Sequence, residues 1–348
     1  MNATKSKKGI VVGLLLVSLG VCTDEGAAQQ TNKIGTAAAT FLRIPVGARA
    51  AGMGGAFVSM VDDPSGLYWN PSVLSSLQSH ALMVDHSPWL PGLTFDFAGI
   101  VLSFGDAGTV GISATVLQTG EMEVTTPQQQ MGTGETFTAA SMAFAVSYSR
   151  SLTRQFAIGG TFKYVRETIY NSSASAIAFD VGTIFETPFA GVRLGASISN
   201  FGTRMQMDGE DLNVRVDIAP DQEGNNQSVV GRLHTDAFDL PLIMRVGLSG
   251  EVIKSDDFRL TLAVDGVSPN DNASSVNLGG ELGFLNDVLR LRAGYRDLFL
   301  NENEFSYTFG MGVNSIRLLG DIAASFEYAY QKYVHLGYAH RFTLGLRF

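Results

Sequence analysis

The sequence predicts an all-β chain: a transmembrane antiparallel β-barrel of about 14 strands with an N-terminal plug segment that contains a short helix. Apolar residues make up 45% of the 348 residues, and only 16% are charged, against about a quarter in an ordinary soluble domain. After residue 28, no apolar run reaches the roughly 18 residues that a membrane-spanning helix needs. Apolar and polar residues instead alternate along many short segments, as in strands that face lipid on one side.

Charge and cysteine content exclude two classes of protein. The 24 basic and 33 acidic residues give a net charge of −9, whereas a nucleic-acid binder needs clustered Lys and Arg to neutralise phosphates. We therefore expect no nucleic-acid partner. Cys22 is the single cysteine, which excludes an intrachain disulfide and a Cys-rich metal site.

The first segment, residues 1–28, has the features of a signal peptide. Lysines precede the apolar run Ile10–Val21, and Gly26-Ala27-Ala28 provides the small residues required before a cleavage site. A lipoprotein signal at Cys22 is the alternative, although Val21 stands where such signals place a small residue. The sequence then divides into a plug segment, residues 29–78, and a barrel, residues 79–348.

Strict alternation identifies the strands of the barrel. Val110, Ile112, Ala114 and Val116 share one face of the segment 109–117, opposite Gly, Ser and Thr residues. The expected strands cover 80–87, 93–104, 109–117, 139–150, 156–166, 176–186, 191–200, 241–252, 258–267, 275–284, 288–296, 305–314, 321–330 and 334–348. In the segment 305–313, Phe305, Tyr307, Phe309, Met311 and Val313 form the apolar face.

A soluble β-sandwich also alternates, but its buried faces seldom oppose a row of guanidinium groups such as Arg290, Arg292 and Arg296. Short connections also alternate with connections that include the long polar stretches 118–138 and 201–240, as periplasmic turns alternate with external loops in outer-membrane barrels. The link 331–333 is an exception, because it is short where an external loop is expected.

The last strand has the pattern of an assembly signal for the barrel-insertion machinery. Its outward face ends in a terminal aromatic residue. The residues proposed for this signal are Tyr338, Phe342, Leu344, Leu346 and Phe348. Phe348 also fits the alternative of a membrane-interface aromatic, and both roles are compatible.

The plug segment is rich in small residues, which would let it pack closely against the inner wall of the barrel. Asp62 or Asp63 is expected to cap a short helix with Pro64 at its first position. The candidate plug residues are Arg43, Pro45, Arg49, Gly52, Gly54, Gly55, Asp62, Asp63, Trp69, Asn70 and Pro71.

Arg43 and Arg49 lie in this otherwise apolar segment, where an unpaired charge would be costly. We expect both to pair with carboxylates that alternation places in the lumen. The candidate carboxylates are Asp180, Asp265, Glu281, Asp321 and Glu327.

The string from Phe41 to Pro71, with its core GARAAGMGGAF and its continuation DDPSGLYWNP, resembles the PorV/PorQ family of outer-membrane proteins. The resemblance extends over the mature chain and implies a 14-stranded barrel similar to the FadL-type transporters, with an N-terminal plug. For the members named PorV and PorQ it also implies a role in type IX secretion. The second half of the motif departs from that of the secretion members, which keeps two functions open.

These functions are docking of secreted cargo or secretion-system subunits and transport of a hydrophobic or small solute. Either places the chain in a bacterial outer membrane, with membrane lipid and the insertion machinery as partners. No nucleophile–base pair or metal-binding motif is recognisable, so we expect no enzyme activity, no metal and no cofactor.

Overall fold

The computed structural model describes residues 35–189, 191–221, 228–255, 258–300, 303–319 and 321–348. Fourteen long strands form one antiparallel sheet, in agreement with the predicted fold class. Their bounds are β1 (Ala81–Leu90), β2 (Leu93–Ser103), β3 (Thr109–Thr119), β6 (Ala139–Ser151), β7 (Phe156–Ile169), β8 (Ser172–Glu186), β9 (Arg193–Gly202), β15 (Ile243–Lys254), β16 (Phe258–Pro269), β17 (Ser275–Phe284), β18 (Leu289–Leu298), β19 (Phe305–Leu319), β20 (Ile322–Tyr333) and β21 (Tyr338–Arg347).

The sheet closes on itself, because β1 pairs with both β2 and β21 and β8 pairs with β9. The backbone N–H of Phe348 donates to the carbonyl of His80 at 3.0 Å, so the two ends of the barrel chain meet at one rim. We call this the short-turn rim, and the opposite one the long-loop rim. The short link expected at 331–333 is at 334–337, because β20 continues to Tyr333.

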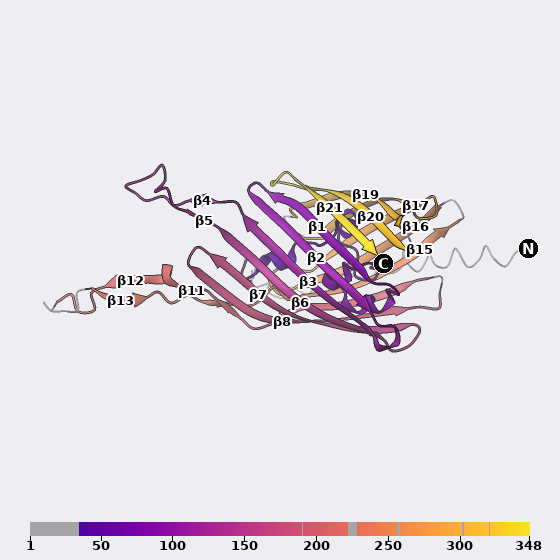
Figure 1. Cartoon of the computed structure of the whole chain (residues 1–348), viewed down its shortest axis with the longest axis horizontal. Helices are drawn as coiled ribbons and strands as arrows, with labels where there is room; N and C mark the ends of the chain where they lie inside the picture. Colours follow the sequence, from indigo (N-terminus) through magenta and orange to yellow (C-terminus); the bar gives the residue numbers. More distant parts are fainter. Residues whose placement is uncertain (1–34, 190, 222–227, 256–257, 301–302, 320) are drawn as a thin grey trace, which may run out of the picture.

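Two hairpins project beyond the long-loop rim (Figure 1). They are β4 (Met122–Glu123) with β5 (Thr136–Phe137), and β12 (Asn213–Val216) with β13 (Val229–Arg232). The other short strands near this rim are β10 (Met205–Gln206), β11 (Asp208–Gly209) and β14 (Ala237–Phe238). The sequence predicted polar loops here and missed these strands, because each is too short for alternation to be visible.

The two faces of the wall differ in exposure as predicted. The side chain of Ile112 points outward, with the residue 51% exposed, whereas Ser113 points into the lumen and is 6% exposed. Phe305 was placed on the outward face, but it lines an internal cavity. The register between β19 and β20 shifts between Phe305 and Thr308, and such an irregularity reverses which face a side chain occupies.

The segment that precedes β1, residues 35–80, lies inside the ring of strands (Figure 1), and we call it the inner segment. Its helical turns are η1 (Thr40–Arg43), α2 (Ala48–Gly52), α3 (Gly66–Trp69) and η2 (Pro71–Ser76). Outside this segment, η3 (Gly105–Ala107) links β2 to β3, and η4 (Glu210–Leu212) links β11 to β12. Helix α3 starts at Gly66 with Ser65 as its N-cap, later than the expected start at Pro64. Asp63 instead accepts a hydrogen bond from the Ser65 N–H at 2.9 Å.

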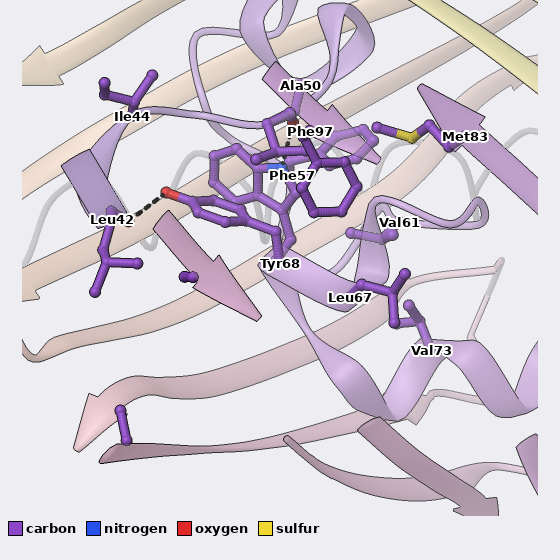
Figure 2. Close-up of a cluster of buried hydrophobic side chains, with 14 of the residues drawn as sticks. Leu42, Ile44, Ala50, Phe57, Val61, Leu67, Tyr68, Val73, Met83 and Phe97 are labelled. Atoms are coloured by element: carbon purple, nitrogen blue, oxygen red, sulfur yellow. Dashed lines mark hydrogen bonds between the residues drawn. The ribbon is translucent and has the colours of Figure 1, made fainter. Parts of the chain in front are cut away.

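The inner segment supplies most of the hydrophobic core (Figure 2). Phe57 and Trp69 pack edge to face with 6.0 Å between ring centroids. The Tyr68 hydroxyl donates to the carbonyl of Leu42 at 3.1 Å (Figure 2). This core lies within the barrel, so the wall and the segment are stabilised by the same buried contacts.

None of the helices among the described residues is long and apolar enough to cross a membrane. The signal peptide expected in residues 1–28 lies outside the described residues.

Replacing the outward-facing Ile112 by Arg should destabilise the barrel by about 2–4 kcal/mol, because a charge near the bilayer midplane is poorly solvated. Gln118 is the matched control, since it is exposed near the end of the same strand, and its replacement by Arg should cost at most about 1 kcal/mol. Urea unfolding in lipid vesicles measures both values. Equal costs at the two positions would contradict the assigned position of β3 in the membrane.

Candidate functional site in the barrel lumen

Two carboxylates of the wall hold the backbone of the inner segment. Asp85 accepts a hydrogen bond from Gly47 N at 3.1 Å, and the side chains of Arg341 and Thr343 also bind it. On the other side of the lumen, Asp265 accepts from Phe57 N at 2.6 Å and Val58 N at 2.8 Å. Backbone N–H groups that no helix or strand satisfies are thereby paired with buried acceptors.

A third anchor is a network of buried charges around Glu281. The Arg49 guanidinium binds both oxygens of Glu281, with Nε–Oε2 2.8 Å and Nη2–Oε1 3.0 Å. Arg259 and Arg292 bind the same carboxylate at 2.9 and 2.7 Å, and Arg292 also pairs with Glu327. The network therefore joins the inner segment to β16, β17 and β18 and, through Glu327, to β20.

Arg49 remains charged in this setting. Burial opposes the charged guanidinium, but the Asp62 and Glu281 carboxylates outweigh burial and raise the pKa of Arg49 well above its usual value. Asp63 adds a weaker contact at 3.4 Å. The prediction that Arg49 pairs with a lumen carboxylate is confirmed.

Glycines let the inner segment touch the wall backbone. A Cβ on Gly52 would lie 2.9 Å from the Cα of Gly310. Gly54 has φ +65°, and a Cβ there would lie 2.7 Å from the backbone N of Tyr295. Larger side chains at either position would push the segment away from β18 and β19.

The other predicted plug residues have structural contacts. Trp69 Nε1 donates to the carbonyl of Val46 at 2.8 Å, and Asn70 Nδ2 donates to the carbonyl of Thr183 in β8 at 3.0 Å. Pro71 packs against the wall, since a Cβ on Gly159 would lie 2.5 Å from its carbonyl carbon. Pro45 and Gly55 line an internal cavity.

Some of the expected partners are different. Arg43 pairs with Asp271 at 3.0 Å, a residue that follows β16 and was not among the candidate carboxylates. Asp321 was expected in the lumen, but it is exposed in a turn before β20. The buried pair Asp85–Arg341 was missed, although alternation along β1 and β21 would have placed both side chains inward.

Four of the proposed assembly residues lie on β21 as expected from alternation, and Phe348 directly follows its last residue. Tyr338, Phe342 and Leu344 are exposed on the outer surface, and Leu346 is half-buried. The Phe348 ring lies 5.9 Å from the ring of His80. Their role in insertion stays a prediction.

Cavities border the inner segment toward both rims. The Arg245 cavity encloses about 350 Å³ toward the long-loop rim and is lined by Trp69, Arg245, Arg296 and Phe305 among others. A second cavity, near the short-turn rim, encloses about 290 Å³ between Arg290 and Arg193. Among the described residues, no group of three His, Cys, Asp or Glu side chains is arranged to hold a metal ion.

Replacing Glu281 by Gln should lower the free energy of unfolding by about 3–5 kcal/mol, because it leaves buried guanidinium groups without their shared carboxylate. Arg204→Met is the control: the Arg204–Asp239 pair is exposed, and its loss should cost less than about 1 kcal/mol. Chemical unfolding in detergent gives both numbers. A similar, small cost for both variants would show that the network contributes little to seating the segment.

A protein-family model described as the type IX secretion system protein PorV matches residues 27–229, more than half of the 348-residue chain. No curated protein matches. Among solved structures, the chain is similar to a Pseudomonas aeruginosa FadL homologue, at 12% identity and a TM-score of 0.54, over 87% of this chain and 98% of the other.

The Pseudomonas putida toluene transporter TodX (12% identity, TM-score 0.53) and the Ralstonia pickettii toluene transporter TbuX (11% identity, TM-score 0.52) match equally well, each over 87% of this chain and 97% of the other. At this identity the likeness establishes the fold alone. The family model is described as a secretion protein, and TodX and TbuX are described as toluene transporters. The chain is thus an outer-membrane protein with a FadL-like barrel, and it belongs to the PorV family.

Proposed function

We propose that this protein is a docking barrel for type IX-like secretion, in which the projecting loops hold secreted cargo while the inner segment closes the lumen. The observation that carries the proposal is the seating of the inner segment. Asp85, Asp265 and Glu281 bind it from three parts of the wall. A lumen occupied in this way favours docking over conduction of a large solute.

The hairpin β12–β13 is the best candidate for the docking element. It projects from the long-loop rim (Figure 1) and exposes the apolar side chains of Val216, Val229 and Val230, the last of them 64% exposed. Among the described strands, β12 and β13 pair only with each other. Their outer edges can therefore accept an added strand from a partner, a common mode of peptide recognition.

Trimming this hairpin should reduce recovery of cargo in a pull-down at least tenfold, about 1.4 kcal/mol of affinity. Asn213 pairs with Arg232. A two-residue Asn-Gly turn in place of residues 214–231 can therefore connect these two paired residues directly. The matched control replaces residues 124–135 of the other hairpin in the same way, between the paired Glu123 and Thr136. The control should retain cargo.

Equal recovery of cargo and secretion-system subunits by the two trimmed proteins would contradict docking through β12–β13. If no cargo is recovered with the unaltered protein, the docking function itself is wrong.

A second candidate is a channel for a small hydrophobic solute. The Arg245 cavity supports this candidate, because the cavity provides about 350 Å³ of space inside the barrel. The solved neighbours described as toluene transporters have the same fold. Loss of solute uptake on gene deletion, with secretion intact, would favour this candidate.

A further inference from the structure

The Arg245 cavity contains a buried cation without a carboxylate partner. Arg245 is 5% exposed, and no carboxylate of the described residues lies within 4.0 Å of its guanidinium nitrogens. Its hydrogen bond to Ser199 Oγ is long, at 3.4 Å. The nearby Asp265 acts on it electrostatically from beyond ion-pair distance. One oxygen of this carboxylate is bound to the backbone of the inner segment, and the other has no hydrogen-bond partner.

Aromatic rings fix the position of this guanidinium. Its Cζ lies 5.1 Å from the centroid of the Trp69 ring and 5.7 Å from that of Tyr68. Such contacts hold the cation without neutralising it. The Arg245 side chain can therefore still donate hydrogen bonds to a molecule in the cavity that it lines.

A second arginine lines the same cavity with spare donors. Arg296 Nη1 is buried and has no hydrogen-bond partner, although its Nε lies 3.3 Å from Asp297. The guanidinium lies 3.9 Å above the Phe305 ring. Two of the three arginines that line the cavity, Arg245 and Arg296, thus lie over aromatic rings.

The rest of the lining combines apolar and polar residues. Its charged members are Arg43, Asp297 and Glu304, which pair with Asp271, Arg296 and His335 respectively. Its apolar part includes Trp69, Phe305, Ile243, Val267 and Pro269. Aromatic and apolar walls with a few fixed polar groups are typical of a small-molecule site. The volume of about 350 Å³ is sufficient for a compact organic molecule.

We propose that the Arg245 cavity binds a small organic carboxylate with a compact, ring-containing apolar body. The two oxygens of a carboxylate match the planar donors of an arginine. The carboxylate would bind Arg245, with Arg296 as a second donor, and the apolar body would pack on Trp69 and Phe305. This site does not depend on the proposed docking function, because it lies inside the barrel lumen rather than on the projecting hairpin.

The two tryptophans of the chain, Trp69 and Trp89, allow a direct test with benzoate as the probe. In a Trp89→Phe background, the fluorescence of Trp69 alone reports on the cavity. Benzoate should change this fluorescence in a saturable manner. Benzyl alcohol, a neutral molecule of similar shape, and inorganic phosphate should bind at least tenfold more weakly, a loss of about 1.4 kcal/mol or more.

Arg245→Gln should raise the dissociation constant for benzoate at least tenfold, and Arg296→Gln should raise it less. Arg193→Gln is the matched control, since this lumen arginine lines the other cavity. Heat-modifiable migration on gels verifies that each variant is folded, and Arg245→Lys replaces Arg245→Gln if the latter fails this check. Absence of saturable binding to the unaltered protein, equal binding of benzyl alcohol, or unchanged binding in the Arg245 variant would overturn the proposal.

Discussion

Glu281 lies on β17 with its carboxylate fully enclosed, and the guanidinium groups of Arg49, Arg259 and Arg292 all bind it. Moving these charges from water into the barrel is costly, and the cost is offset only while all partners are in place. Arg49 belongs to the inner segment, whereas the other three belong to the wall. The closed barrel and the seated segment therefore require each other.

The same dependence explains the composition of the lumen. Side chains alternate between the two faces of each wall strand. The apolar ones face lipid, so the polar ones face the lumen. The inner segment binds two of them, Asp85 and Asp265, through the backbone N–H groups of Gly47, Phe57 and Val58. Its glycines bring this backbone close enough to bind, as at Gly54 beside Tyr295. A loop-like segment with few helical turns is thus held by hydrogen bonds and ion pairs to the wall.

Most of the wall could be predicted from the sequence, because the alternation that marks a strand such as β3 is local and also fixes which face meets lipid. For pairings between distant residues, the sequence could limit the candidates but could not choose among them. Alternation placed both Glu281 and Asp180 in the lumen, but alternation alone could not show which of the two pairs with Arg49. Phe305 was assigned to the wrong face because a register shift is invisible without the partner strand. The hairpin β12–β13 was missed because its strands have four residues each.

The central claim is that the inner segment seals the lumen, and single-channel conductance in planar bilayers tests it most directly. The unaltered protein should remain closed. The double variant Arg49→Ala, Gly54→Leu should open a stable conductance, because it removes the bond to Glu281 and forces a side chain into the backbone of Tyr295. A large, stable conductance in the unaltered protein, or a double variant that stays closed, would contradict the account.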